Sequence, residues 1–234
     1  MYTSRASSCV RRPVASVARG AFVLPVRPLD MTRDELLSLF KRSGALLEGH
    51  FRLSSGLHSS GYLQCALVLQ YPADAEVLGR ALAARVAGTG PTAVLSPALG
   101  GVVIGHEVAR ALGVRALFAE RLDGVLTLRR GFALGASDRV VVVEDVVTTG
   151  GSTRETIEVA TAAGAQVVAA VAVVDRSAGT VDLRVPSLTF SALLDVALPT
   201  YEPDSCPLCQ RGVAVIKPGS RPGPARTPPE SRFG

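Results

Sequence analysis

The residues best suited to chemistry form one run, VVVVEDVVTTGGS, over residues 140–152. Four consecutive valines are typical of a strand buried on both faces of a parallel sheet, and Glu144 and Asp145 follow them directly. The loop 148–152 contains only threonine, glycine and serine, so its backbone amides can close on a phosphate at the start of a helix. Because carboxylates repel phosphate, acids beside such a loop indicate a ligand that also carries hydroxyls, such as ribose 5-phosphate.

An ordinary strand–turn–helix joint, with Ser152 capping the helix, is the competing interpretation and would be preferred for an isolated Gly-Gly pair. The complete run favours the ligand site. A P-loop is excluded because GxxxxGK[ST] does not occur, and a dinucleotide site is excluded because GxGxxG is missing and the acids precede the glycines.

A second candidate is Arg176, which follows an apolar strand predicted over 166–175. A guanidinium group binds a flat carboxylate through two parallel hydrogen bonds. The alternative is a solvated charge at a strand end, and the residues alone do not decide between the two interpretations.

The histidines and cysteines do not suggest a metal site. His50, His58 and His106 have no spacing typical of metal ligands, and CPLC at 206–209 has no second cysteine pair to complete the four ligands of zinc. We therefore expect no metal bound directly by side chains. A structural or incidental role is favoured for the cysteine pair, with redox activity as the alternative.

A framework of alternating strands and helices must position these residues. Thr32 and Glu35 form the capping-box pattern TxxE ahead of an apolar helical face, and Asp123-Gly124 is expected to form a turn. Such alternation predicts an α/β fold with a parallel sheet of about five strands, joined by right-handed crossovers. The pattern predicts further helices over 73–87, 100–112 and 152–163, and strands over 92–96, 115–120, 139–145, 166–175 and 188–196.

The two ends of the chain differ from its centre. Residues 1–30 are rich in arginine and serine without periodicity, and residues 217–234 are rich in proline and glycine, so both are expected to be disordered. A transit peptide and a start codon placed ahead of the true start at Met31 both fit the first segment, and the second explanation is favoured.

Charge and hydropathy exclude several classes of protein. Residues 31–216 hold 16 basic and 18 acidic residues, a net charge of −2, so no nucleic-acid partner is expected although the whole chain is +5. There is no secretory signal and no uncharged apolar run long enough to span a bilayer, so no membrane partner is expected either. A cytoplasmic location is the expectation.

The run at 140–152 resembles the phosphoribosyl-pyrophosphate motif of type I phosphoribosyltransferases: apolar strand, two acids, two apolar residues, threonine-rich loop, glycine, then serine. The resemblance covers about residues 30–221 and implies the type I phosphoribosyltransferase fold, with helices flanking the sheet, a small hood and a phosphoribosyltransferase domain over 31–216. The segments that resemble one bacterial branch of orotate phosphoribosyltransferases are GHFRLSSGLHSSGYLQCA (49–66), SPALGGVVIGHEVARALG (96–113), TLRRGF (127–132), VVDRS (173–177) and CPLC…KPGSR (206–221).

The resemblance implies a role for each matching residue. Glu144 and Asp145 would bind the ribose hydroxyls, with Asp145 also needed for turnover, and Thr148 and Arg176 would hold orotate. The segment that would wrap the 5-phosphate comprises Val146, Val147, Thr148, Thr149, Gly150, Gly151 and Ser152. The loop that would contact pyrophosphate comprises Pro97, Ala98, Leu99, Gly100 and Gly101.

The sequence departs from the family where positive charge is usual. The hood segment has no lysine near Ser54, and the stretch 120–132, which would close over pyrophosphate, contains no lysine at all. Arg121 is therefore predicted to supply the catalytic charge, reaching the site of a neighbouring subunit in a homodimer. Arg129 and Arg130 either assist or are solvated strand charges.

The reaction implied is transfer of ribose 5-phosphate from phosphoribosyl pyrophosphate to orotate, giving orotidine 5′-phosphate and pyrophosphate in pyrimidine biosynthesis. Mg²⁺ would bind mainly through the substrate. The alternatives are a purine phosphoribosyltransferase, which should carry a lysine and an aromatic residue in place of Asp175-Arg176, and a non-enzymatic regulator on the same fold, which usually needs a basic face.

Overall fold

A computed structural model describes residues 31–53 and 55–218 of the chain. The described chain opens with α1 (Arg33–Arg42), which begins at the predicted capping box. The Thr32 hydroxyl accepts from the Glu35 amide at 3.3 Å, and Glu35 in turn accepts from the Thr32 amide at 2.8 Å. These two bonds satisfy amides that the first helical turn would otherwise leave unpaired.

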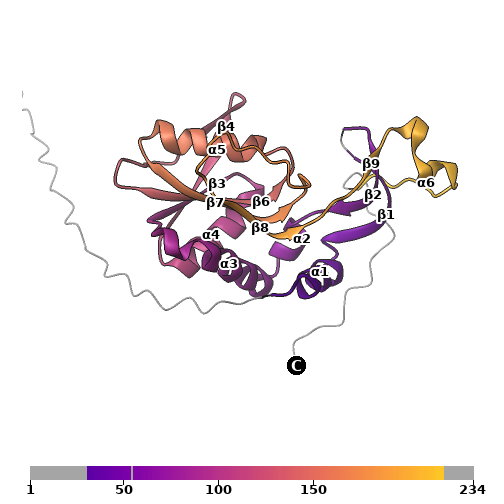
Figure 1. Ribbon diagram of the computed structural model, residues 1–234, viewed down its shortest axis with the longest axis horizontal. Coiled ribbons are helices and arrows are strands. Elements are labelled where there is room, and N and C mark those ends of the chain that lie inside the picture. The colour runs from indigo at the N-terminus through magenta and orange to yellow at the C-terminus, as the bar shows by residue number, and fades with distance from the viewer. Residues whose placement is uncertain (1–30, 54, 219–234) are drawn as a thin grey trace, which may run out of the picture.

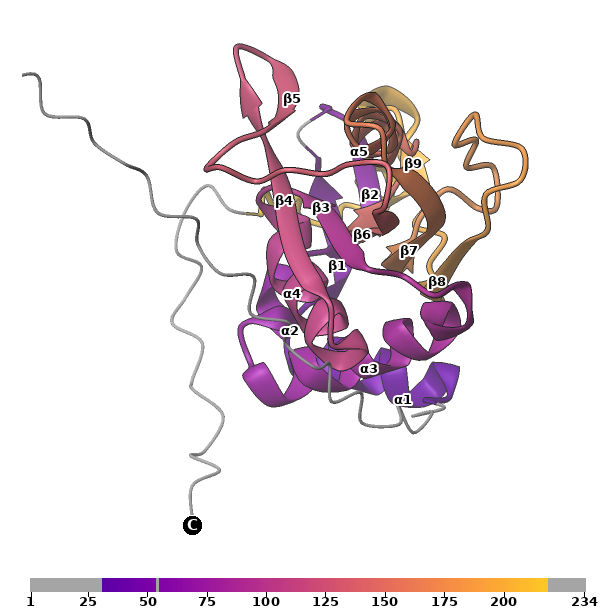
Figure 2. The same cartoon turned by 90° about the vertical axis from the view of Figure 1, so that its left-hand side faces the viewer.

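A six-stranded sheet forms the centre of the molecule, in the order β5-β4-β3-β6-β7-β8. Every neighbouring pair is parallel except β4–β5, which forms an antiparallel hairpin. Figure 2 shows this hairpin extending beyond the body of the molecule. The strands are β3 (Ala93–Pro97), β4 (Arg115–Leu122), β5 (Val125–Leu128), β6 (Arg139–Val147), β7 (Gln166–Asp175) and β8 (Phe190–Asp195).

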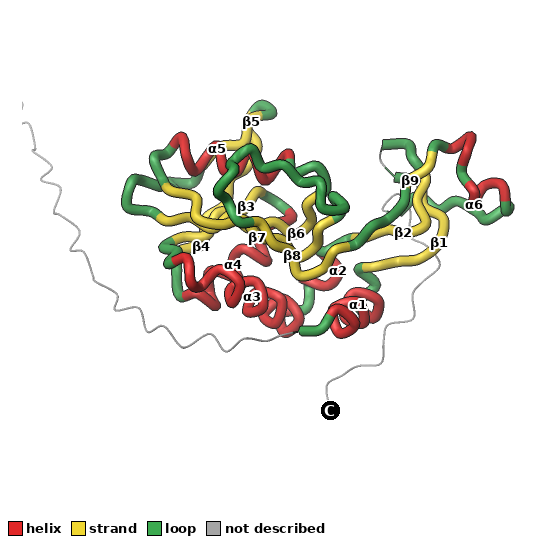
Figure 3. Tube along the Cα trace, in the orientation of Figure 1, coloured by secondary structure: helices red, strands yellow, loops and turns green. Residues whose placement is uncertain are grey.

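Helices cover both faces of the sheet, as Figures 1 and 3 show: α1, α3 (Pro72–Val86) and α4 (Gly100–Leu112) lie on one side, and α5 (Gly151–Ala162) on the other. The four valines of β6 explain why both faces are apolar. Val141 and Val143 join the core against α3 and α4, whereas Val140 and Val142 join the core against α5. Successive side chains of a strand point to opposite faces, so an unbroken apolar run serves two cores.

A second, three-stranded sheet lies beside the central body, in the order β1-β2-β9. It joins the hairpin of β1 (Leu46–Arg52) and β2 (His58–Leu63) to β9 (Thr200–Tyr201). We call this sheet, together with residues 202–216, the hood. The short elements η2 (Pro203–Ser205) and α6 (Pro207–Gln210) complete it, while α2 (Ala66–Leu69) leads from the hairpin back to α3, and η1 (Ala87–Thr89) follows α3.

The structure confirms the α/β class, the parallel sheet and the small hood, and it corrects details. The sheet has six strands rather than about five, because residues 125–128 pair with β4 across the predicted Asp123-Gly124 turn. Asp123 and Gly124 both have positive φ, 52° and 85°, as a tight hairpin turn requires. The predictions for residues 1–30 and 219–234 lie outside the described residues. Among the described helices, none is both long and apolar enough to cross a membrane.

Candidate functional site

The acidic pair and the hydroxyl-rich loop lie together at the carboxyl end of β6, in the centre of the sheet. Glu144 is buried and Asp145 half-buried, whereas Thr148 and Thr149 are exposed. Gly150, with a φ of 75°, directly precedes α5 in the N-cap position, and no side chain caps that helix. The helix thus presents unpaired amides and a partial positive charge beside two carboxylates, which is the arrangement that a sugar phosphate needs.

Gly150 holds the phosphate loop, residues 148–152, in its conformation. A Cβ there would lie 2.8 Å from a methyl group of Val181, and the positive φ also disfavours other residues. Arg154 ties the same loop to the segment between β7 and β8, because one of its guanidinium nitrogens donates to the carbonyls of Thr149 (2.8 Å) and Asp182 (2.7 Å). Sequence reasoning missed Arg154, since nothing in its spacing distinguishes it from a solvated helix charge.

The predicted pyrophosphate loop, 97–101, lies against the acidic pair. A Cβ on Gly100 would stand 2.6 Å from Asp145 Oδ1, so the absence of a side chain at Gly100 lets the loop approach this carboxylate. The peptide bond between Ala98 and Leu99 is cis, and Leu99 is exposed. The structure therefore brings the loop 97–101 and the two acids together, while their roles in binding pyrophosphate and ribose stay predictions.

Glu144 carries the most perturbed pKa of the site. Burial, the largest cause, and the neighbouring negative charge of Asp145 together raise this pKa from 4.5 to about 9. Two carboxyl groups thus share this end of β6, and no cation among the described residues forms an ion pair with either of them. The site is suited to groups that donate hydrogen bonds or bring positive charge, such as ribose hydroxyls and a metal-bound substrate.

Arg176 stands next to this site at the end of β7. Val147 pairs with Asp175 in the sheet, and the Arg176 amide donates to the Val147 carbonyl at 2.8 Å. The Arg176 Nε is buried and has no hydrogen-bond partner among the described residues. Burial also lowers the pKa of this guanidinium, since no described acid compensates for its lost hydration. A half-buried guanidinium whose buried Nε has no described partner is a candidate site for a ligand carboxylate.

Arg121 lies on the β4–β5 hairpin and is held within its own chain. Its guanidinium donates to the Gly124 carbonyl at 2.7 Å and forms an ion pair with Glu155 of α5 at 2.8 Å. Arg129 and Arg130 both pair with Glu120. The role predicted for Arg121 in catalysis therefore requires it to leave Glu155, and that role stays a prediction.

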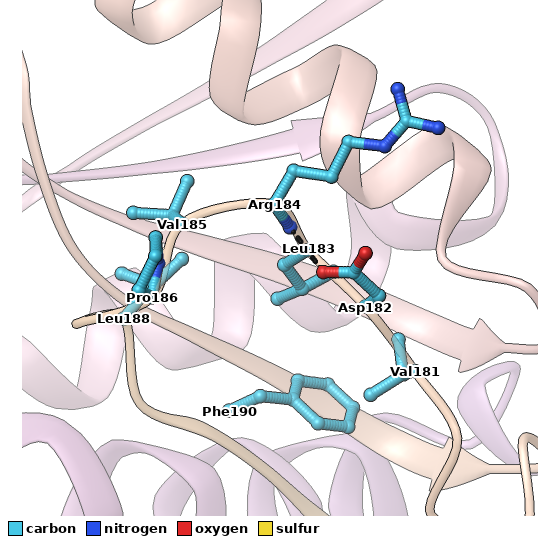
Figure 4. Close-up of a pocket in the computed structure, with 8 residues that line it drawn as sticks. All are labelled: Val181, Asp182, Leu183, Arg184, Val185, Pro186, Leu188 and Phe190. Atoms are coloured by element: carbon cyan, nitrogen blue, oxygen red, sulfur yellow. Dashed lines mark hydrogen bonds between the residues drawn. The ribbon is translucent and has the colours of Figure 1, made fainter.

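A pocket of about 200 Å³ lies in the segment between β7 and β8 (Figure 4). Most of its lining residues are apolar in type, and Figure 4 shows the Arg184 guanidinium directed away from the hollow. It offers little to a sugar phosphate, and it borders Gly150 through Val181 and Leu183. We regard it as support for the phosphate loop. Its lining residues are Val181, Asp182, Leu183, Arg184, Val185, Pro186, Leu188 and Phe190.

One cluster of histidine and cysteine side chains was not expected from the sequence. His50, His58, Cys206 and Cys209 present their nitrogen and sulfur atoms within 4.8 Å of one another. The sequence analysis found no metal-like spacing of these histidines, and spacing along the chain could not reveal an arrangement contributed by β1, β2 and the segment around α6 together. His106 is exposed on α4 and takes no part.

The fold and the site define a phosphoribosyltransferase: a parallel sheet that delivers two acids, a phosphate loop and a second glycine loop to one edge. The family described as phosphoribosyl transferase domain matches residues 69–192. The chain is 55% identical over 191 residues to the orotate phosphoribosyltransferase of Pelotomaculum thermopropionicum, which covers 82% of this chain and 99% of that protein. It thus belongs to the orotate phosphoribosyltransferase family.

Two further comparisons agree. The orotate phosphoribosyltransferase of Heliobacterium modesticaldum is 55% identical over 193 residues, covering 82% of this chain and all of that protein. The crystal structure of orotate phosphoribosyltransferase from Aeropyrum pernix superposes with a TM-score of 0.58 at 27% identity, covering 69% of this chain and 93% of that one. The relatives therefore match the core of the chain over nearly their full length.

Proposed function

We propose that this protein transfers the 5-phosphoribosyl group of phosphoribosyl pyrophosphate to N1 of orotate, releasing pyrophosphate and orotidine 5′-phosphate in pyrimidine biosynthesis. The observation that carries the choice of base is the buried, unpartnered Arg176 Nε beside the phosphate loop. Orotate is a flat base with a carboxylate, which a guanidinium binds through two hydrogen bonds. The names of the relatives support the same substrate.

Different residues of the site bind different parts of the substrates. The amides of the phosphate loop and of the α5 N-terminus bind the 5-phosphate, while Glu144 and Asp145 accept from the ribose hydroxyls. The loop 97–101 contacts the pyrophosphate, and Thr148 with Arg176 orients orotate so that N1 faces C1 of the ribose. As the bond to pyrophosphate breaks, positive charge develops on the sugar, and the two carboxylates stabilise it.

The site also fits Mg²⁺, because its carboxylates are hard oxygen donors and lack a described cationic partner. Glu144 and Asp145 would hold the ion indirectly, through the ribose hydroxyls that they bind. Mg²⁺ supplies charge neutralisation to the leaving pyrophosphate when it is bound. We further propose that the protein acts in the cytoplasm as a homodimer, in which the extended β4–β5 hairpin reaches the partner's site.

A substrate panel tests this proposal. Purified protein is mixed with phosphoribosyl pyrophosphate and Mg²⁺ and then with orotate, uracil, adenine, guanine or hypoxanthine, and loss of base and release of pyrophosphate are followed. Turnover with orotate alone is expected. Turnover with a purine would reassign the enzyme, and binding of phosphoribosyl pyrophosphate without turnover of any base would indicate a regulator.

A further inference from the structure

A cluster of two histidines and two cysteines lies in the hood, outside the proposed active site. His50 comes from β1, His58 from β2, and Cys206 and Cys209 from the segment that carries α6. His50, His58 and Cys206 are buried, with 2%, 7% and 0% of their surface exposed, and Cys209 is the exposed member. Four side chains of the types that bind zinc thus converge from three separate elements.

Four of the six distances between the ligand atoms can be compared with a tetrahedral ligand set, and the other two lie within 4.8 Å. The His50 Nε2 lies 2.9 Å from His58 Nδ1, 3.5 Å from Cys206 Sγ and 3.7 Å from Cys209 Sγ, and the last sulfur lies 3.3 Å from His58 Nδ1. Usual zinc–nitrogen and zinc–sulfur bonds give tetrahedral edges of about 3.3–3.8 Å. Of these four distances only the one between the two nitrogens is shorter, and a small rotation of either ring would lengthen it.

The tautomer of His50 is already set for metal binding. Its Nδ1 lies 2.7 Å from the Val213 carbonyl, which can only accept, so Nδ1 carries the proton. Nε2 is therefore the unprotonated nitrogen, and it lies within 2.9–3.7 Å of the other three ligand atoms. A backbone carbonyl that orients a histidine in this way is the usual outer partner of a zinc ligand.

From this geometry we propose that His50, His58, Cys206 and Cys209 bind one structural zinc ion. Both thiols lose their protons to solvent on binding, so the two thiolates balance the charge of the ion while the histidines stay neutral. Four protein ligands leave no open position for a water or a substrate, which is the property of a structural rather than a catalytic site.

A structural metal would stabilise the hood, because the apolar core of the hood is small. Phe51 and Leu208 are buried, yet neither joins the two large apolar clusters of the central body. Near the end of the segment, Val213, Val215 and Ile216 are exposed by 42%, 47% and 56%. The segment is otherwise held by few backbone bonds, among them Arg52 amide to Ile216 carbonyl at 2.9 Å. Small units with little core are commonly stabilised by a metal.

Metal content of the full-length protein tests the proposal. Protein purified under reducing conditions is incubated with Zn²⁺, desalted and measured by elemental mass spectrometry, with about one zinc per chain expected. Cys209→Ser and His58→Gln should each lower this content at least tenfold. The matched controls, Cys65→Ser and His106→Gln, change the same residue types outside the cluster and should keep the full content.

A second measurement needs no variant and therefore cannot fail through misfolding. Replacing zinc by Co²⁺ in the unaltered protein should give the strong visible bands of a tetrahedral ion and a thiolate-to-cobalt charge-transfer band. A strong chelator should then lower the Tm of the protein, and added Zn²⁺ should restore it. Both responses would be absent from a hood held by hydrogen bonds alone.

Three outcomes would overturn the proposal. The first is a protein that binds no zinc and gives no tetrahedral cobalt spectrum. The second is zinc content that survives both cluster substitutions. The third is an isolated protein whose intact mass is lower by two hydrogen atoms, as a disulfide would make it, and which binds no zinc after reduction. This result would identify Cys206 and Cys209 as a redox pair.

Discussion

At the scale of single residues, the site holds ionisable groups that the free protein leaves without a compensating partner. Glu144 shares the end of β6 with Asp145, and Arg176 at the end of β7 has a buried Nε without a partner. Each of these groups costs stability in the empty protein, since burial removes its water. Their presence is explained if substrate supplies the hydroxyls and the carboxylate that complete them.

Glu144 gives a prediction for the dependence of stability on pH. Its pKa rises from 4.5 in the unfolded chain to about 9 in the folded one, so the folded protein binds the extra proton between these values. The contribution of this group to stability is therefore complete below pH 4.5 and is lost as pH rises towards 9. We expect Glu144→Gln to raise the Tm of the substrate-free protein at pH 8 and to change it little at pH 5.

Thermal unfolding of both proteins across this pH range checks the prediction. Turnover of Glu144→Gln should fall even as its stability rises, because the amide cannot replace a carboxylate that accepts from two hydroxyls. An equal change in Tm at pH 5 and pH 8 would show that ionisation of Glu144 is not the cause.

Arg176 gives a prediction about binding. Arg176→Ala should weaken orotate binding by about 2 kcal/mol or more, roughly thirtyfold, because the ligand carboxylate would be left buried without its partner. Affinity for phosphoribosyl pyrophosphate should change little. Titration calorimetry with each ligand measures the two effects, and Arg184→Ala, an exposed arginine of the next segment, serves as the control. Equal losses for both ligands would remove Arg176 from the base site.

The two classes of site residue differed in how far sequence could predict them. Glu144, Asp145 and the phosphate loop are contiguous in the chain, so a single sequence motif contained all of these site residues. The ligand cluster is not: Cys206 and His50 are 156 positions apart and meet only through the pairing of β2 with β9 and of residue 51 with residue 216. Spacing rules detect local metal motifs, and this cluster is a product of tertiary structure.

At the scale of elements, the central helices and strands were predicted closely. Helix α4 and strand β7 begin and end where expected, and α3 and α5 are each shifted by one residue. Their apolar periodicity is strong because they pack on a large core. Strand β5 was not predicted, since it has only four residues and is itself the edge strand of the sheet, so its sequence shows little of the apolar pattern of a buried strand.

The β4–β5 hairpin yields a prediction at this scale. If Arg121 leaves Glu155 and reaches the pyrophosphate, Arg121→Ala should lower turnover roughly a hundredfold, as loss of one transition-state donor does elsewhere. Orotate affinity should change little. Steady-state kinetics on Arg121→Ala and Glu155→Gln separate the possibilities, because the second variant removes the resting partner and keeps the cation.

Retained turnover in Glu155→Gln together with its loss in Arg121→Ala is the expected pattern. Normal turnover in both variants would show that the Arg121–Glu155 pair only connects the hairpin to α5. The positive charge opposite the leaving group would then have to come from another residue.

At the scale of the whole molecule, the first described residues are already capped and packed against the core. The capping box at Thr32 begins α1, and Met31 packs on the main core. We expect a chain that starts at Met31 to keep the Tm and the orotate turnover of the full-length protein. Thermal unfolding and steady-state assays of the two chains, side by side, check this. Aggregation or lost turnover of the shorter chain would assign residues 1–30 a part in the fold.

The pairing of β2 with β9 also has a consequence for synthesis on the ribosome. The hairpin is complete when Leu63 is made, but the strand that completes its sheet begins only at Thr200. At translation rates of about 5–20 residues per second, the edge of β2 waits roughly 7–27 s for its partner. The central sheet can form from its own strands during that interval. The hood is thus the last part of the nascent chain to fold. A chain truncated before Thr200 would leave the edge of β2 without its partner strand.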